Sequence, residues 1–214
     1  MQQCIKALFL LLILSACENA NDKTVYKPQS SGNINDLSVV IDSQLWESSV
    51  GESLRSTIGA PLYGLPQDEP QYKLRQIPSS VFSGFVQNTR LVLKVVKRVA
   101  ADTKFYKDPY ASPQRMVLVS GMTNQDIIDQ LTANQDKIEK TFKVYEIKEK
   151  QRRFRKSLFN SSAITKQLGI GIQIPSIYRF ATQEDDFFWF LRDLKTVPFN
   201  LLLYTVPYAQ NISR

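Results

Sequence analysis

Residues 90–99, RLVLKVVKRV, are the stretch that decides the fold of this chain. The residues at 91, 93 and 95 are all apolar, whereas those at 92, 94 and 96 include Lys94. Successive side chains of a strand point to opposite faces, so one face of this stretch is fully apolar and the other is partly apolar. The sequence therefore predicts a β-strand that is buried on one face and partly buried on the other.

Other strand-like runs lie on both sides of this stretch. They occupy residues 37–41, 72–77, 104–106, 116–120, 169–174, 177–181, 187–191 and 199–206. Short apolar runs of this kind, with prolines such as Pro109 and Pro113 in the gaps between them, are typical of strands separated by turns.

Helical periodicity begins after the first of these runs. The apolar residues that repeat every four positions are Trp46, Val50, Leu54 and Ile58. Residues with this spacing lie on one face of a helix. The sequence predicts a single helix here, ended by Gly59 and the proline that follows.

A second helical segment opens with a capping box formed by Thr123 and Asp126. Apolar residues then follow a helical period as far as Leu158, which predicts one long helix or two in sequence. Strands followed by helices, and then by strands again, predict the class α+β. We expect a mainly antiparallel sheet packed against two or three helices.

The N-terminus predicts a lipoprotein signal. Lys6 precedes an unbroken apolar run at residues 7–14, and two small residues follow before Cys17. A charged start, a short hydrophobic region and a small-residue cleavage site make a secretory signal, and a cysteine after that site receives a diacylglyceryl group in bacteria. The apolar run is too short to span a bilayer, which needs about 20 residues. A plain secretory signal with an incidental cysteine is the alternative.

The chain is therefore expected to have three parts. Residues 1–16 are the signal peptide, residues 17–32 are a polar tether, and residues 33–214 form the α+β domain. The tether is rich in turn residues and has no core to bury. A weaker sub-boundary falls near Ser161.

Composition excludes several kinds of chemistry. The chain has no histidine and two cysteines, of which Cys4 leaves with the signal and Cys17 carries the lipid. Without an imidazole or a free thiol, Ser–His and Cys–His catalysis and zinc sites built on these ligands are excluded. We predict no catalytic residue, no metal and no cofactor, although a mechanism that uses carboxylates or a lysine stays open.

The net charge of +7 raises the question of an anionic partner. Nucleic acid is not expected, because an exported lipoprotein rarely meets it. The densest group of positive charges is formed by Arg152, Arg153, Arg155 and Lys156. These residues predict contact with an anionic membrane, where each charge contributes about 1 kcal/mol. The alternative is an exposed helix end whose cations complement the helix dipole.

The two tryptophans, Trp46 and Trp189, lie close to acidic residues in the sequence. Aromatic rings beside carboxylates suit a sugar-binding platform, and paired carboxylates suit glycosidase chemistry. We expect instead that both rings belong to the core, because Trp46 lies on an apolar helix stripe and Trp189 lies within an aromatic run. A ligand contact by either ring is the alternative. The adjacent carboxylates at 68–69 and 184–186 are typical of solvated turns.

A set of short motifs runs along the chain. It comprises LWE at 45–47, GE at 51–52, LR at 54–55, GLPQ at 64–67, EP at 69–70, RFRKSL at 153–158, IP at 174–175, Tyr178 and DFFW at 186–189. This set resembles a family of lipoproteins from the Bacteroidota that is classed as a domain of unknown function. The resemblance extends from about Ser31 to Tyr208. It implies a lipoprotein of the cell envelope and offers no catalytic residue to transfer.

Members of that family continue past the point that matches Pro207, so the resemblance implies a fold that is incomplete at its C-terminal end. The apolar run at residues 199–206 is then either a central strand or an edge strand that awaits a missing segment or a partner. The resemblance favours the edge.

These observations predict a non-catalytic protein that is anchored by a lipid in the cell envelope, with the outer membrane as the expected location. Its expected role is to bind or scaffold an envelope protein. A lipoprotein that binds or processes a ligand or glycan, through carboxylates and aromatic residues, is the alternative.

Overall fold

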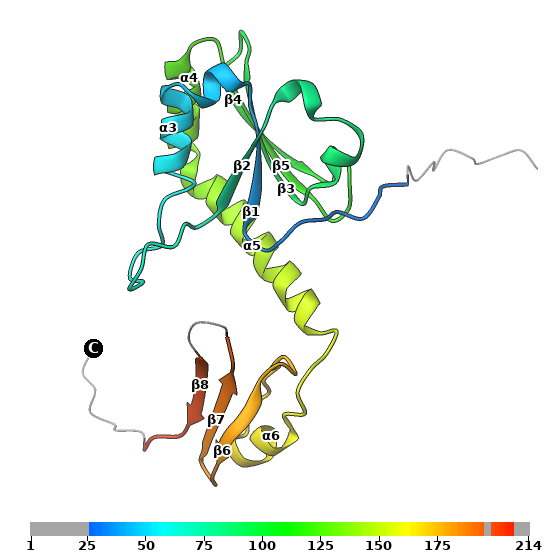
Figure 1. Ribbon diagram of the computed structural model, residues 1–214, viewed down its shortest axis with the longest axis vertical. Coiled ribbons are helices and arrows are strands. Elements are labelled where there is room, and N and C mark those ends of the chain that lie inside the picture. The colour runs from blue at the N-terminus through cyan, green and yellow to red at the C-terminus, as the bar shows by residue number, and fades with distance from the viewer. Residues whose placement is uncertain (1–25, 195–197, 208–214) are drawn as a thin grey trace, which may run out of the picture.

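The computed structural model describes residues 26–194 and 198–207, which form two units joined by a long helix (Figure 1). The N-terminal unit, residues 26–156, is built on a five-stranded sheet, and the C-terminal unit, residues 157–207, is built on a three-stranded sheet. The class α+β predicted from the sequence is confirmed.

The larger sheet is mixed. Its strands are β1 (Asp36–Val40), β2 (Lys73–Ile77), β3 (Leu91–Lys97), β4 (Asp102–Lys107) and β5 (Arg115–Gly121), in the order β2-β1-β3-β5-β4. β1 pairs in parallel with β2 and β3, β3 pairs in parallel with β5, and β4 alone runs antiparallel. The expectation of a mainly antiparallel sheet is therefore wrong for this unit. The physical reason is that long connections between β1, β2 and β3 form crossovers, and crossovers join parallel strands.

The first helical segment is broken in two. α2 (Ser43–Trp46) and α3 (Ser49–Ser56) replace the single helix expected there. The hydroxyl of Ser48 accepts a hydrogen bond from the backbone N–H of Val50 and so caps α3 as a new helix. Gly51 allows the close approach, because a Cβ there would lie 1.8 Å from the carbonyl oxygen of Trp46.

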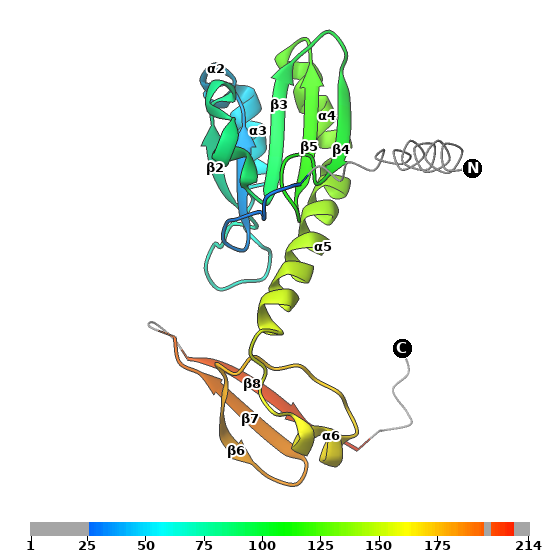
Figure 2. The ribbon, with the colours of Figure 1, turned by 90° about the vertical axis from the view of Figure 1, so that its right-hand side faces the viewer.

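The capping box is confirmed, and two helices follow it. α4 (Asn124–Ala133) begins at Thr123, whose hydroxyl and backbone exchange hydrogen bonds with Asp126. α5 (Gln135–Phe154) follows directly. Figure 2 shows α5 crossing the sheet and continuing toward the C-terminal unit. Among the described residues, no helix combines the length and the apolarity that a bilayer-spanning segment needs.

Three helices, α3, α4 and α5, cover one face of the larger sheet (Figure 1). The core beneath them is made by alternate residues of the strands together with the apolar stripes of the helices. Its fully buried members include Leu93, Val117, Leu54, Ile127 and Phe142. The alternation of apolar residues at 91, 93 and 95 therefore correctly predicted the buried face of β3.

The opposite face is covered over only part of its width. Two short 3-10 helices, η1 (Ser79–Val81) and η2 (Gly84–Asn88), connect β2 to β3 and lie on this face. Crossover connections between parallel strands have the same hand. The connection from β1 to β2 and the connection from β2 to β3 run in opposite directions along the sheet, so they lie on opposite faces. This explains why α3 and the 3-10 segment lie on different sides. The cluster beneath them joins Phe82 to Val40, Val92 and Met116, so the part of the face near β4 stays open.

The C-terminal unit has an antiparallel sheet in the order β6-β7-β8. β6 spans Arg179–Gln183, β7 spans Phe187–Arg192, and β8 spans Phe199–Tyr204. A helix that the sequence did not predict, α6 (Ser162–Leu168), packs Ile164 against Phe188 and Phe190. Residues 169–174 were predicted to form a strand and do not, because Gly169 takes the left-handed conformation that ends α6.

A buried ion pair joins three segments of the N-terminal unit. Arg90 donates from Nε to Glu146 Oε1 at 2.7 Å and from Nη2 to Oε2 at 3.0 Å, and both side chains are 2% exposed. Arg90 also donates to the carbonyl oxygens of Gly32 and Asn33, and the backbone N–H of Asn35 donates to Glu146. The N-terminal segment, the start of β3 and the middle of α5 are therefore held by one network.

Candidate functional site

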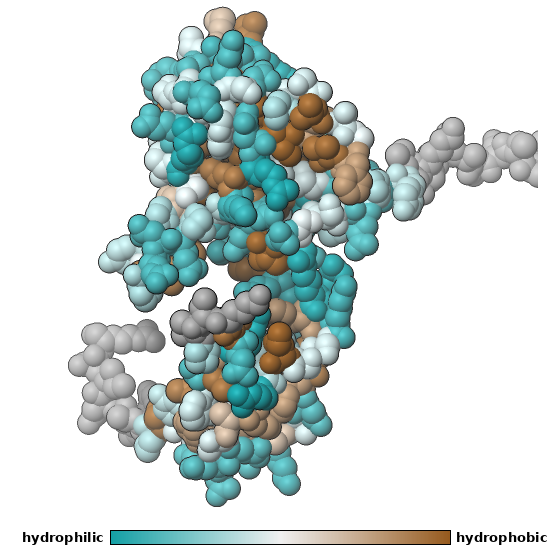
Figure 3. All heavy atoms as spheres, viewed as in Figure 1, coloured by the Kyte–Doolittle hydropathy of each residue, from teal (hydrophilic) through white to brown (hydrophobic). Residues whose placement is uncertain are grey.

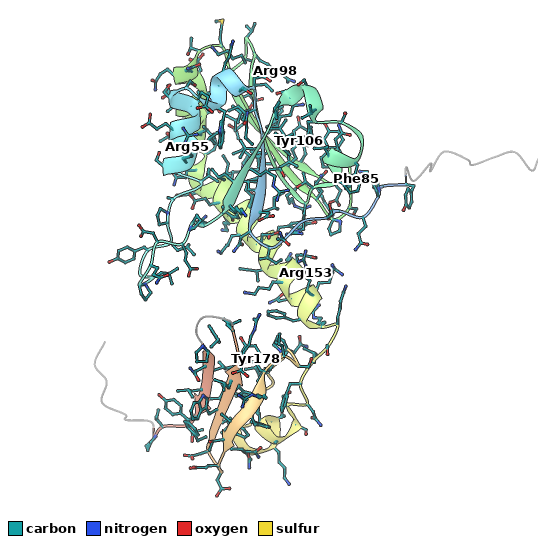
Figure 4. The ribbon with its side chains drawn as sticks, viewed as in Figure 1. Arg55, Phe85, Arg98, Tyr106, Arg153 and Tyr178 are labelled. Atoms are coloured by element: carbon teal, nitrogen blue, oxygen red, sulfur yellow. The ribbon has the colours of Figure 1, made fainter. Side chains whose placement is uncertain are left out.

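The basic run at the end of α5 is partly used inside the protein. Arg152 donates from Nε and Nη2 to the carboxylate of Glu149 at 2.7 and 2.9 Å, and Arg153 donates from Nε to the same carboxylate at 2.8 Å. Arg153, labelled in Figure 4, also donates to the carbonyl oxygen of Gly32 at 2.8 Å. Two of the four cations in the run are therefore structural.

The buried carboxylate of Glu149 explains why Arg152 and Arg153 are both held within the protein. Its side chain is only 6% exposed, and a buried carboxylate needs charged partners. Hydrogen bonds from Arg152, opposed by burial and aided by Arg153, lower the pKa of Glu149 to about 2. Within the described residues, Arg155 and Lys156 have no ion pair, so they are the cations that remain for an anionic surface. Contact of the run with a membrane stays a prediction.

Trp46 is half-buried. It packs against the main core cluster at the end of α2. The guanidinium carbon of Arg55 lies 5.0 Å from the centre of its ring, and Arg55 also donates to the Trp46 carbonyl oxygen at 3.3 Å. Arg55 therefore lies over the ring, which also borders a pocket with Pro70 and Leu74, and a ligand contact at Trp46 stays a prediction.

Trp189 lies on the outer face of the C-terminal sheet, and the expectation that it is a core residue is wrong. Strand β7 alternates, so that Phe188 and Phe190 are fully buried while Trp189 is 36% exposed. The aromatic run FFWF hid this alternation, because all four residues are apolar. Its indole N–H donates to Asn200 Oδ1 at 2.8 Å.

Neighbouring side chains extend the outer surface around Trp189. Trp189 is paired with Leu202 and Phe187 with Tyr204 across β7 and β8, so these four side chains share one face with Asn200. We call this set, Phe187, Trp189, Asn200, Leu202 and Tyr204, the open face. Tyr204 is 60% exposed, and no element among residues 26–194 and 198–207 packs on the open face. An exposed apolar surface of this kind is a candidate interaction site.

The strand that borders the open face also ends the sheet. β8 lies at the edge of the order β6-β7-β8 within the described part of the chain. Of the two alternatives for residues 199–206, the edge strand is the one observed. An edge strand presents backbone N–H and C=O groups that can pair with another strand.

A smaller apolar patch lies where the N-terminal segment meets the 3-10 helices. Phe85 is 81% exposed, and Val81 and Val86 are exposed beside it. Figure 3 shows hydrophobic side chains on this side of the N-terminal unit, and Figure 4 places Phe85 there. The backbone N–H of Ser31 donates to the Asn88 carbonyl oxygen at 2.8 Å, so the chain from the N-terminus joins the fold next to this patch. Cys17 lies outside the described residues.

Two family models match the chain. A domain of unknown function, DUF8532, matches residues 30–155, which is more than half of the chain. The chain belongs to the DUF8532 family. A second domain of unknown function, DUF4837, matches residues 157–214, so the DUF8532 region ends where α5 ends, and the chain after it is similar to DUF4837. No curated protein and no solved structure matches the chain.

No group of three or more Asp, Glu, His or Cys side chains that could hold a metal ion is found among the described residues. The acidic turn at residues 184–186 is exposed, as the sequence indicated. The open face and the patch around Phe85 are two exposed apolar surfaces among the described residues.

The Glu149 network predicts a pH-dependent loss of stability. Because the folded pKa of about 2 lies below the ordinary 4.5, the ionised carboxylate stabilises the fold above pH 4.5, and this contribution is lost as the pH falls toward 2. Glu149→Gln should lower the free energy of unfolding by about 2 kcal/mol at pH 7, a figure discounted because both arginines are partly exposed. The difference from wild type should shrink below pH 4.5 in urea unfolding followed by circular dichroism.

Glu69→Gln is the matched control, because Glu69 is exposed in a loop and has no salt bridge among the described residues. It should leave the pH profile unchanged. A difference between Glu149→Gln and wild type that stays constant from pH 7 to pH 3 would contradict the assigned role.

Proposed function

We propose that this chain is a lipid-anchored protein of the bacterial cell envelope that binds or scaffolds a partner protein and does not catalyse a reaction. The lipid is attached at Cys17, and the outer membrane is the proposed location. Resemblance to lipoproteins of the Bacteroidota and the signal before Cys17 support the anchor. The open face supports the binding role.

The patch around Phe85 supports attachment on the N-terminal side. Aromatic and aliphatic side chains favour the membrane interface. Exposed Phe85, Val81 and Val86 next to the segment that leads toward Cys17 add apolar contact to the lipid. The anchor and the patch would then act on the same surface.

The anchor is tested by metabolic labelling with a clickable analogue of palmitate. The wild-type chain should be labelled, because the thiol of Cys17 and the amino group freed by cleavage receive the acyl chains. Cys17→Ser should abolish the label, whereas Cys4→Ser, the only other cysteine substitution the chain offers, should retain it. Persistent labelling of Cys17→Ser would contradict the proposal that the anchor is attached at this residue.

The observation that supports a protein partner is the open face. Burial of apolar area contributes about 25 cal/mol per Å², so an uncovered set of aromatic and aliphatic side chains gains by packing against another apolar surface. The neighbouring edge of β8 offers backbone hydrogen bonds to the same partner. A partner that adds a strand or a sheet face would satisfy both features.

A glycan is the second candidate, because aromatic rings stack on sugar rings. The polar groups on the open face are few, and sugar sites need several placed donors and acceptors. Asn200 is the amide on this face, and its Oδ1 already accepts from the Trp189 indole. The geometry therefore favours a protein partner over a glycan.

The binding role is tested by removing apolar area from the open face. The double change Trp189→Ser with Leu202→Ser should abolish recovery of the partner that co-purifies with the detergent-solubilised wild-type chain, measured by quantitative mass spectrometry. The unfolding midpoint should change little, because both side chains are exposed. Val99→Ser, at an exposed position of the N-terminal unit, is the control and should keep the partner.

Equal recovery of the partner with the double variant would contradict the proposal. Calorimetric binding of an envelope polysaccharide that depends on Trp189 would instead establish the glycan candidate.

A further inference from the structure

The uncovered part of the larger sheet, on the side away from the helices, forms a hollow. It has a volume of about 280 Å³ and is lined by Lys94, Arg98, Tyr106, Pro109, Tyr110, Met116 and Leu118. These residues come from β3, β4, β5 and the adjoining loops. Figure 4 shows Tyr106 on the side of the sheet opposite Arg55, which belongs to α3.

The strand register explains how the hollow is built. Lys94 of β3 and Lys104 of β4 are both paired with Leu118 of β5, so a lysine lies on each side of an apolar floor. Met116 and Tyr106 are level in the next row. The 3-10 segment forms one wall, because Lys94 Nζ lies 5.8 Å from the ring centre of Phe82.

The charges in the hollow are of one sign. Lys104 is paired with Asp102 at 3.2 Å, but Lys94 and Arg98 have no salt bridge to any described residue. No carboxylate contributes to the lining of the hollow. Two cations therefore face an apolar and aromatic floor that no carboxylate lines, and Asp102, which lines an adjoining hollow together with Arg98, is paired with Lys104.

The charge of Lys94 lowers the stability of the fold at this position. β3 lies between β1 and β5, and the Lys94 side chain is half-buried between them. Partial burial of a charge without a charged partner lowers stability, and an apolar residue would suit the neighbouring Met116 and Leu118 better. A ligand that brings a negative charge to this place would offset the cost.

We propose that this hollow binds an organic oxyanion, a phosphate or carboxylate attached to a flat apolar group. The oxyanion accepts charge-assisted hydrogen bonds from Lys94 and Arg98, and Arg98 can hold two oxygens at once. The flat group rests on Met116 and Leu118 beside the rings of Tyr106 and Tyr110. The volume of about 280 Å³ lies just below the range of about 300–1,000 Å³ that is typical of sites for drug-sized ligands, so the hollow suits a small aromatic anion. The hollow belongs to the N-terminal unit and does not depend on the open face.

Calorimetry with phenyl phosphate and with benzoate tests the inference on the full-length chain in nonionic detergent. At least one of the two anions should bind with a Kd of about 1 mM or lower, whereas benzyl alcohol, which has the ring without the charge, should not bind measurably. Lys94→Gln and Arg98→Gln should each weaken binding about tenfold. Lys94→Met should abolish binding while the unfolding midpoint stays equal or rises, because Met suits the apolar floor.

Lys97→Gln is the matched control. Lys97 lies on the same strand, but its position in the alternation directs it to the other face, where it is exposed. It should leave the Kd unchanged, as should Trp189→Ser in the C-terminal unit. Failure of both anions to bind, equal binding of benzyl alcohol, or equal weakening by Lys97→Gln or Trp189→Ser would overturn the proposal.

Discussion

The buried pair between Arg90 and Glu146 is the interaction on which the rest of the structure depends. Two charges removed from water are tolerated only when every hydrogen-bonding group has a partner, and here the carboxylate also receives the backbone N–H of Asn35. The pair fixes the residue that precedes β3 against the middle of α5. Because α5 continues from Glu146 to the C-terminal unit, the direction of that helix is set where the pair forms (Figure 2).

Gly32 links this pair to the second acidic centre. Its carbonyl oxygen accepts from Arg90 Nη1 and from Arg153 Nη2, while Arg153 also holds Glu149. Gly32 has a φ of 120°, a conformation that side-chain-bearing residues rarely adopt, so glycine allows the carbonyl to face both guanidinium groups. The N-terminal segment is therefore held against α5 by two arginines, and two charges that look like surface charges in the sequence are parts of the fold.

Local patterns predicted local structure well. The alternation in β3 and the capping box at Thr123 depend on residues close in the sequence, and both are present. The parallel pairing and the outward direction of Trp189 depend on contacts between distant segments, which periodicity does not contain. The helix break at Ser48 depends on a local cap, which the spacing of the apolar residues does not show. The sequence shows Lys94 as a single charge within an apolar strand. Its place in a hollow could not be predicted, because the hollow depends on the strand order, which puts β5 and β4 next to β3, and on the 3-10 segment, which leaves that part of the sheet uncovered.

A double-mutant cycle on the buried pair tests this dependence most directly. Trp46 fluorescence in a Trp189→Phe background reports unfolding of the N-terminal unit, since the chain has two tryptophans. Arg90→Met and Glu146→Leu should each lower the free energy of unfolding by about 3–5 kcal/mol, because each leaves a buried charge unpaired. The double change should cost far less than the sum of the two, and it should cost less than either single change. Additive losses, or single losses below about 1 kcal/mol, would contradict a central role for the pair.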